Sequence, residues 1–180
     1  VGCTELGDHC LYSRDSWRAN PAKFTVPLEH PVPIVVISAN EGDSCTDYIT
    51  CSQEMRDTQQ DDMYYRPKGG QPDIVYNFMI GGDGNVYEGR GWDVQSYHEG
   101  ADKVLGISFI GDYNPDKQTL NEQQIDAAQQ LIKYGVEVGK IDENYQLVGH
   151  NQVHNTNSPG RNIIEEIRHW PHWDPTYRHR

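Results

Sequence analysis

The chain has 180 residues, a length that fits a single domain with a hydrophobic core of its own. Its 15 Lys and Arg residues against 27 Asp and Glu residues give a net charge of −12, which disfavours nucleic acid and anionic membrane surfaces as partners. No stretch approaches the roughly 20 apolar residues of a membrane span, and no charged segment followed by an apolar one opens the chain.

Residues 1–33 carry prolines at positions 21, 27, 31 and 33 and show little periodicity. They predict an irregular N-terminal segment that packs on the domain. Because the chain begins with Val1 and not with Met, we expect a mature form or an excised ectodomain. Any attachment to a membrane would then run through a segment outside this chain.

The cysteines form two close pairs, Cys3 with Cys10 and Cys45 with Cys51. A disulfide can close either short loop, so we expect pairing within each pair. A zinc site built from the thiols is the alternative, and we disfavour it because neither pair has the short gap typical of such sites. Disulfides require an oxidising compartment, which predicts an extracellular protein, at the cell surface or secreted.

The rest of the chain predicts one mixed sheet with three helices. Apolar runs predict strands over residues 34–37, 104–110 and 146–149, with a hairpin within residues 76–92. We expect helices from a Ser52 cap to about residue 63, from an Asn121 cap to Gly139, and over residues 160–169. A loop is expected between the first helix and the hairpin, over residues 64–72.

Residues 76–92 read YNFMIGGDGNVYEGRGW and hold the most informative pattern of the chain. Phe78 and Ile80 lead into the glycine-rich run at 81–85, and Val86 begins the returning strand. The glycines supply the positive-φ positions that such a turn demands. By its pattern alone, the hairpin is most simply a piece of core sheet.

Together with LGISFIGDYN at residues 105–114 and GHNQVHNTNSPG at residues 149–160, this run resembles the peptidoglycan recognition protein (PGRP) family. The similarity extends from about Ser13 to about His172. It implies an N-acetylmuramoyl-L-alanine amidase-like α/β fold, with a central mixed β-sheet flanked by three helices. The recognition domain would span residues 34–173, followed by a frayed tail at 174–180.

The resemblance also bears on the disulfides and on a metal centre. It implies a Cys45–Cys51 disulfide, which leaves Cys3 and Cys10 to pair with each other. Hydrolytic members of the family bind zinc through two histidines and one cysteine, and these ligands map onto Ser38, His150 and Ser158. Neutral serine hydroxyls do not supply the imidazole and thiolate that zinc favours. We therefore expect no zinc, no other cofactor and no amidase activity.

Three further residues belong to this hydrolytic region. Tyr76 and Thr156 match family positions that help or line the hydrolytic site, but neither can hydrolyse peptidoglycan without the metal. His154 lies four residues after His150 and could rebuild a metal site if both stood on a helix. The residues between them predict a loop, so we disfavour that alternative.

In the family, a groove on the same face holds the sugar and the stem peptide of a peptidoglycan fragment. The positions that match its wall are Tyr76, Asn77, Trp92, His98 and His150. Aromatic faces suit sugar CH groups, while His and Asn side chains can hydrogen-bond to a peptide. Tyr76 and Trp92 could equally be packing residues of the core.

Other positions along the groove depart from the family pattern. Tyr97 is bulky where Ala is usual, and Asp93 and Val94 match neither usual stem-peptide type. Lys103 is displaced by one position from an Arg that binds the extra carboxylate of diaminopimelate. The loop at residues 64–72 is lengthened and that at 99–104 is shortened. The sequence thus decides neither the preference between lysine and diaminopimelate types nor whether the groove is open.

Three functions are compatible with this sequence: a zinc amidase, a direct non-catalytic binder of muropeptides, and a receptor ectodomain that pairs with another PGRP carrying a muropeptide. We favour the third, a non-catalytic innate immune receptor ectodomain for peptidoglycan sensing, because the chain resembles the ectodomains of transmembrane insect receptors. The polar face of the second helix, over residues 121–140, is a candidate contact with the partner, whose identity the sequence leaves open.

Overall fold

Residues 32–39 read VPIVVISA and form an inner strand of the sheet, β3 (Val32–Ala39), in the computed structural model. The structure describes residues 2–65 and 70–178. β3 pairs in parallel with β6 (Val104–Phe109) on one side and with β7 (Ile141–Gly149) on the other. A strand that is buried on both faces needs apolar residues on both, which explains the near-continuous apolar run.

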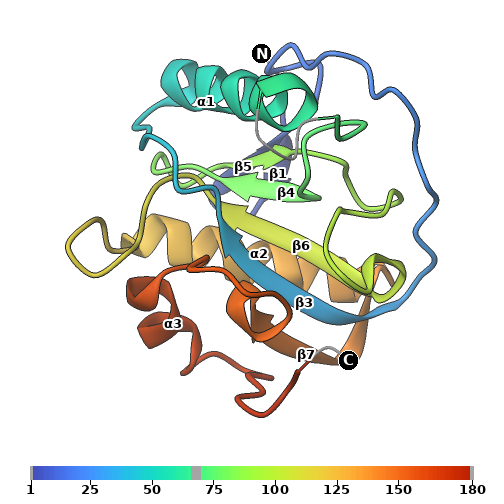
Figure 1. Cartoon of the computed structure of the whole chain (residues 1–180), viewed down its shortest axis with the longest axis vertical. Coiled ribbons are helices and arrows are strands. Elements are labelled where there is room, and N and C mark those ends of the chain that lie inside the picture. Colours follow the sequence, from blue (N-terminus) through green and yellow to red (C-terminus); the bar gives the residue numbers. More distant parts are fainter. Residues whose placement is uncertain (1, 66–69, 179–180) are drawn as a thin grey trace.

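Within the described residues, seven strands form one mixed sheet (Figure 1). Their order is β1-β2-β5-β4-β6-β3-β7, where β1 is Thr4–Leu6 and β2 is His9–Tyr12. β4 (Phe78–Ile80) pairs in parallel with β6 and antiparallel with β5 (Val86–Glu88), which confirms the predicted hairpin. Gly84 adopts a φ of 77° in its turn, a conformation that glycine takes without strain.

Three α-helices accompany the sheet in the described part of the chain: α1 (Tyr48–Gln60), α2 (Glu122–Glu137) and α3 (Arg161–Ile167). Short helical turns complete the elements, a π turn at Asp61–Tyr65 and 3-10 turns at Ala101–Lys103 and His150–Gln152. The predicted fold class, a central mixed β-sheet flanked by three helices, is confirmed.

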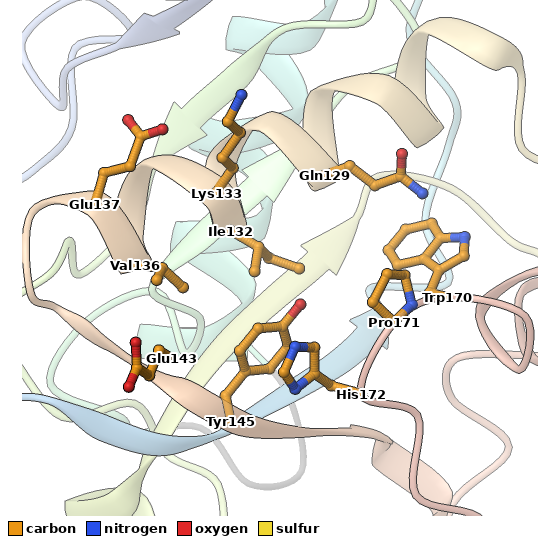
Figure 2. A pocket seen from close by; sticks show the side chains of 10 residues that line it. All are labelled: Gln129, Ile132, Lys133, Val136, Glu137, Glu143, Tyr145, Trp170, Pro171 and His172. Carbon is orange, nitrogen blue, oxygen red and sulfur yellow. The ribbon is translucent and has the colours of Figure 1, made fainter.

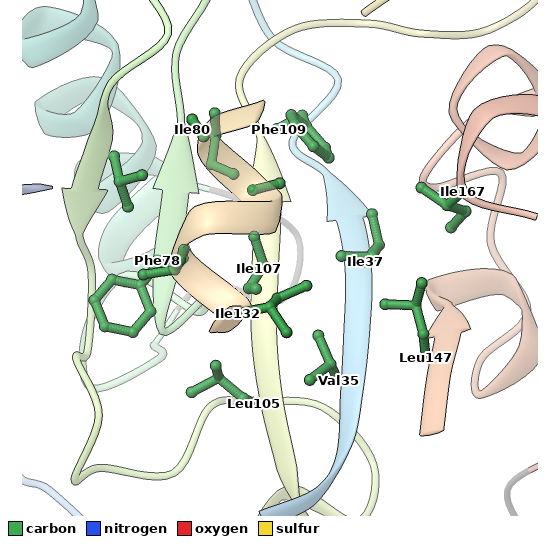
Figure 3. Close-up of a cluster of buried hydrophobic side chains, with 14 of the residues drawn as sticks. Val35, Ile37, Phe78, Ile80, Leu105, Ile107, Phe109, Ile132, Leu147 and Ile167 are labelled. Carbon is green, nitrogen blue, oxygen red and sulfur yellow. The ribbon is translucent and has the colours of Figure 1, made fainter. Parts of the chain in front are cut away.

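The two faces of the sheet carry different cores. On the face covered by α2 and α3, side chains from alternate strand positions form one continuous apolar cluster (Figure 3). Its members include Val35, Ile37, Phe78, Ile107, Leu147, Ile132 of α2 and Ile167 of α3. On the opposite face, Cys51 and Met55 of α1 pack with Met79 and Tyr87. Because successive strand residues point to opposite faces, Ile37 and its neighbour Ser38 lie on different sides.

Helix α1 begins earlier than predicted. Asp47 caps it and accepts a hydrogen bond from the Thr50 backbone N–H at 2.8 Å, while the Thr50 side chain accepts one from the Asp47 backbone. Because this reciprocal capping box lies upstream, the predicted cap Ser52 is buried inside the helix. The helix continues as a π turn to Tyr65, so the loop predicted from residue 64 starts later; residues 66–69 lie outside the described residues.

The N-terminal segment, expected to be irregular, contributes two strands. β1 (Thr4–Leu6) and β2 (His9–Tyr12) form an antiparallel hairpin, and β2 pairs in parallel with β5. All of the prolines that suggested irregular structure come after this hairpin, so none removes a backbone donor from its pairing. Both expected disulfides, Cys3–Cys10 and Cys45–Cys51, are present.

Residues 174–178 are docked on the domain, where a frayed tail was expected over 174–180; residues 179 and 180 lie outside the described residues. The Asp174 backbone N–H donates to the Leu147 carbonyl at 3.0 Å, and the Gln146 side chain donates to the Asp174 carboxylate at 2.7 Å. Tyr177 packs against a small apolar cluster that includes Val148. β7 is the last strand of the sheet, so the tail covers backbone groups that an uncovered edge would expose.

The boundaries of α2 and β7 depend on the residues next to them. Asn121 caps α2 through a reciprocal bond with Gln124, as predicted, and Gly139 follows its end with a φ of 78°. β7 begins at Ile141, earlier than expected, because the polar residues 142–144 hide the strand pattern. Among the described residues, no helix is long and apolar enough to cross a membrane.

Candidate functional site

Parallel pairing brings the three expected metal-ligand positions to one end of the sheet. Ile37 pairs with Gly149, so His150 follows the end of β7 beside the segment that holds Ser38. Ser158 joins them from the loop before α3: its Oγ accepts a hydrogen bond from the Ala39 backbone N–H at 3.0 Å and lies 3.0 Å from His150 Nδ1. Sites often form at the carboxyl ends of parallel strands.

This donor set does not fit zinc. Ser38 Oγ is buried without a hydrogen-bond partner in the described structure, and Ser158 Oγ is bonded to backbone and to His150. Neutral hydroxyls are poor ligands for zinc, which prefers imidazole, thiolate or carboxylate. No group of three or more His, Cys, Asp or Glu side chains among the described residues could hold a metal ion. The residues present can donate and accept hydrogen bonds but supply no metal-activated water.

Next to these positions, four rings pack together in what we call the aromatic cluster: Tyr76, Tyr97, His98 and His150. The Tyr97 ring meets the Tyr76 ring edge-on at 6.0 Å and lies 5.0 Å from His98 and 6.1 Å from His150, measured between ring centroids. His98 and His150 meet edge-on at 4.7 Å. Tyr97 is 36% exposed, whereas the other three are buried, so Tyr97 is the outer member.

His98 is the most confined residue of the aromatic cluster. A Cβ on Gly106 would lie 2.7 Å from its ring, so the ring needs glycine at that position of β6. Neither of its ring nitrogens has a hydrogen-bond partner within the described structure. Burial, assisted by the positive potential of His150 and Arg90, lowers the pKa of His98 well below its usual value. The ring is therefore neutral at physiological pH.

Asn77 was expected in the groove wall, and its side chain forms hydrogen bonds with backbone groups of neighbouring segments. Its side-chain NH₂ donates to the carbonyls of Gly91 and Val94 at 2.9 and 2.7 Å, and its Oδ1 accepts from the Gly106 backbone N–H at 2.7 Å. Both amide protons are used in these bonds and the residue is fully buried. It ties the chain after the hairpin to β6 and leaves no donor for a ligand.

Trp92 is not brought together with the aromatic cluster. It packs at 4.6 Å on Phe78 and at 6.2 Å on Tyr134 of α2, within the apolar cluster of the other face. A Cβ on Gly135 would lie 2.8 Å from the Trp92 ring. Trp92 is therefore a packing residue of the core, which is one of the two roles that the sequence left open.

The charged and aliphatic candidates also lie apart from the aromatic cluster. Asp93 bonds to Lys140 at 2.7 Å and lies 3.3 Å from His30, and Val94 forms an isolated bridge with Pro27. Lys103 is exposed in the turn that precedes β6, at the amino end of that strand. It stands at the opposite strand end from the Ser158 region.

The loop after β7 holds the other two hydrolytic-site candidates. The Thr156 hydroxyl accepts a hydrogen bond from the Ser158 backbone N–H at 3.2 Å. His154 stacks at 5.9 Å on His150 and pairs with Glu99 at 3.0 Å, so its ring is directed to that carboxylate. Both residues therefore shape the rim of the site.

A hollow on the other side of the sheet was missed by sequence reasoning. It has a volume of about 510 Å³ and lies between α2, β7 and the segment after α3 (Figure 2). Ile132 and Val136 point from α2 toward Tyr145, whose ring stacks on His172 at 4.0 Å. Helical periodicity could have identified the α2 side, but the contribution of residues 170–172 depends on the path of the chain after α3.

The chain matches the family model described as N-acetylmuramoyl-L-alanine amidase over residues 28–161. It is 42% identical to peptidoglycan-recognition protein SC1a of Drosophila melanogaster, covering 91% of this chain and 86% of that protein. It is 39% identical to peptidoglycan recognition protein 1 of Rattus norvegicus, covering 93% and 92%.

Its fold is similar to a solved structure of tracheal cytotoxin bound to the ectodomain complex of peptidoglycan recognition proteins LCa and LCx. The TM-score is 0.85 at 37% identity, with 91% of this chain and 98% of that chain covered. The similarity extends over nearly the whole chain in both sequence and structure, and the chain therefore belongs to the peptidoglycan recognition protein family.

Proposed function

We propose that this chain is a non-catalytic, extracellular ectodomain for peptidoglycan sensing that pairs with another PGRP carrying a bound muropeptide. In this function the muropeptide lies in the groove of the partner and contacts an outer surface of this chain. The ligand then bridges two receptor ectodomains. The protein acts at the cell surface or as a secreted protein, in keeping with its two disulfides.

The observation that carries this proposal is the closure of the aromatic cluster. Tyr97 covers His98, and the two rings that could recognise a peptide, His98 and His150, are both buried at 4% exposure. A ligand-binding wall normally offers its polar groups to a cavity. Here His98 and His150 are buried behind the Tyr97 ring, which favours a partner-dependent function over direct capture.

The absence of catalysis is supported by the donor set. Ser38 and Ser158 stand where the family resemblance puts two of the zinc ligands, and Ser158 is bonded to His150 and Ala39. Amide hydrolysis in such a site needs a metal to activate water and polarise the carbonyl. Added zinc should therefore produce no muropeptide cleavage; cleavage that a chelator abolishes would contradict this part of the proposal.

Two solved relatives support the ligand class and the pairing. The LCa and LCx structure is an ectodomain complex with tracheal cytotoxin bound, and a second neighbour, PGRP-LE, is in complex with the same compound, described as monomeric diaminopimelic acid-type peptidoglycan. The second relative is 36% identical to this chain with a TM-score of 0.86. An ectodomain pair with a bound muropeptide is thus an assembly that a relative with this fold forms, and this supports the pairing proposed for this chain.

The test is a titration of a fluorescent monomeric muropeptide, followed by anisotropy, with this chain alone and with a second PGRP ectodomain. We expect no saturable binding to this chain alone. Sedimentation should show a mixed complex only when ectodomain and muropeptide are both present. Saturable binding to this chain alone would overturn the co-receptor function and favour direct recognition, a second candidate that the unpartnered nitrogens of His98 support.

A matched pair of charge reversals tests where the partner contacts this chain. Lys133 is exposed on α2, the proposed contact, and Lys117 is exposed in the loop before α2. Lys133→Glu should weaken the mixed complex about tenfold, whereas Lys117→Glu should not. Equal effects of the two changes would contradict α2 as the contact.

A further inference from the structure

The strongest unexplained feature of the site is His98. Its ring is 4% exposed and lies against Gly106, and neither nitrogen has a hydrogen-bond partner in the described structure. A buried polar group without a partner destabilises a fold, and the large majority of such groups are paired. Its backbone is held, since the His98 N–H donates to Ser96 Oγ at 3.4 Å. The ring nitrogens are thus available to a partner that the free protein does not contain.

Access to His98 passes Tyr97. Tyr97 is the exposed member of the aromatic cluster, and its ring makes contact with the other three rings. The Tyr97 backbone N–H donates to the Val75 carbonyl at 3.1 Å, which anchors the main chain. Rotation about the Cα–Cβ bond of Tyr97 would therefore move the ring off His98 without moving the backbone.

We propose that Tyr97 is a lid over a recognition subsite formed by His98 and His150, and that its position determines whether this chain binds a muropeptide by itself. The ligand group suited to the subsite is a peptide amide of the muropeptide stem. An amide offers one N–H donor and one carbonyl acceptor, which matches the donor and acceptor of an imidazole ring. This inference rests on the proposed function, in which the closed lid accounts for the need for a partner.

The ring contacts of Tyr97 determine how much free energy is needed to open the lid. In the closed position Tyr97 keeps three ring contacts, at 5.0, 6.0 and 6.1 Å, and a ligand must replace them. Contacts between aromatic rings are each worth enough that losing two or three changes an equilibrium by about tenfold or more. Removing the ring should then tighten direct binding by that factor.

The experiment compares Tyr97→Ala with Tyr97→Phe, which keeps the ring and serves as the matched control. Isothermal titration with a monomeric muropeptide should show that Tyr97→Ala binds at least about tenfold more tightly than both the wild type and Tyr97→Phe. Adding His98→Phe to Tyr97→Ala should abolish the gain. Tyr97→Leu provides the same test with an apolar side chain should the alanine variant unfold.

A folded Tyr97→Ala or Tyr97→Leu variant that binds no better than the wild type would overturn the lid. A gain that survives His98→Phe would overturn the subsite. Neither result affects the co-receptor function, which is tested by the mixed complex of the wild type with a second ectodomain. Conversely, a wild type that forms no mixed complex would reject that function and leave the Tyr97 comparison valid.

Discussion

The two faces of the β-sheet are built on different principles. The α2 and α3 face is a continuous apolar cluster from Leu6 to Trp170, with its side chains interdigitated (Figure 3). The α1 face is interrupted by polar groups: the hydroxyls of Ser38 and Ser108 and the ring of His98 are buried without partners in the described structure. Packed apolar groups stabilise a fold, and unpaired polar groups oppose it. One face therefore carries stability, and the other holds the groups that suit recognition.

The largest effect should come from the apolar face. Ile37 is fully buried in the cluster beneath α2, and Ile37→Ala should lower the free energy of unfolding by about 2–5 kcal/mol, because it removes buried methyl groups and leaves a cavity. Chemical denaturation measures this. A loss below about 1 kcal/mol would show that the cluster repacks and that the contrast between the faces is weak.

The second effect concerns the junction between the site and the hairpin. Asn77→Ala removes three hydrogen bonds and leaves the Gly106 N–H and the carbonyls of Gly91 and Val94 without their partner. We expect a loss of about 2–4 kcal/mol in stability, since unsatisfied buried groups are costly. Hydrogen exchange of the Gly106 amide should accelerate as well. An unchanged exchange rate would argue that another group satisfies this amide.

The third test uses pH. Folding lowers the pKa of His98 below the value of about 6.5 that a histidine has in the unfolded chain. As the pH falls through about 6.5, the unfolded chain therefore binds a proton at His98 that the folded protein does not bind. The stability due to neutral His98 is complete above about pH 6.5 and is lost below it. The wild type should lose at most about 1.4 kcal/mol per pH unit more than His98→Phe. Parallel stability curves of the two proteins would exclude His98 as the titrating group.

The smallest effect should come from Ser38, the strand neighbour of Ile37 on the opposite face. Its hydroxyl is buried without a partner, so Ser38→Ala should change stability by about 0 to 1 kcal/mol in the stabilising direction. Denaturation of Ile37→Ala and Ser38→Ala side by side gives the comparison directly. A clear destabilisation by Ser38→Ala would mean that the hydroxyl has a bonded partner, such as a buried water, in solution.

Local patterns predicted much of the fold. The apolar run of β3, the hairpin around Gly84 and the Asn121 cap were visible because each depends on neighbouring residues. The start of α1 was misplaced because two plausible caps, Asp47 and Ser52, lie close together, and the capping partner Thr50 decides between them. β1 and β2 were missed because strands of three and four residues are too short to show periodicity.

The candidate site was predicted less completely. Ser38, His150 and Ser158 come together at one sheet end, as the family resemblance implied. Trp92 and Asn77 were expected as ligand-binding residues of the groove wall, yet Trp92 packs under α2 and the Asn77 side chain bonds backbone groups. Asn77 precedes β4 and Trp92 lies in the segment beyond β5, so neither is fixed by the alternation of a strand, and sequence spacing does not reveal which way each side chain turns.

By itself, the sequence determined the order of the helices and of the strands from β3 onward, the pairing of the cysteines and the chemistry available at each site position, because these depend on local periodicity, on short spacings and on side-chain type. Only the tertiary structure decided that Tyr97 lies over His98, that Trp92 lies on the other face and that the tail covers β7. Those arrangements depend on contacts between segments far apart in the chain, where packing and hydrogen bonding outweigh local preference.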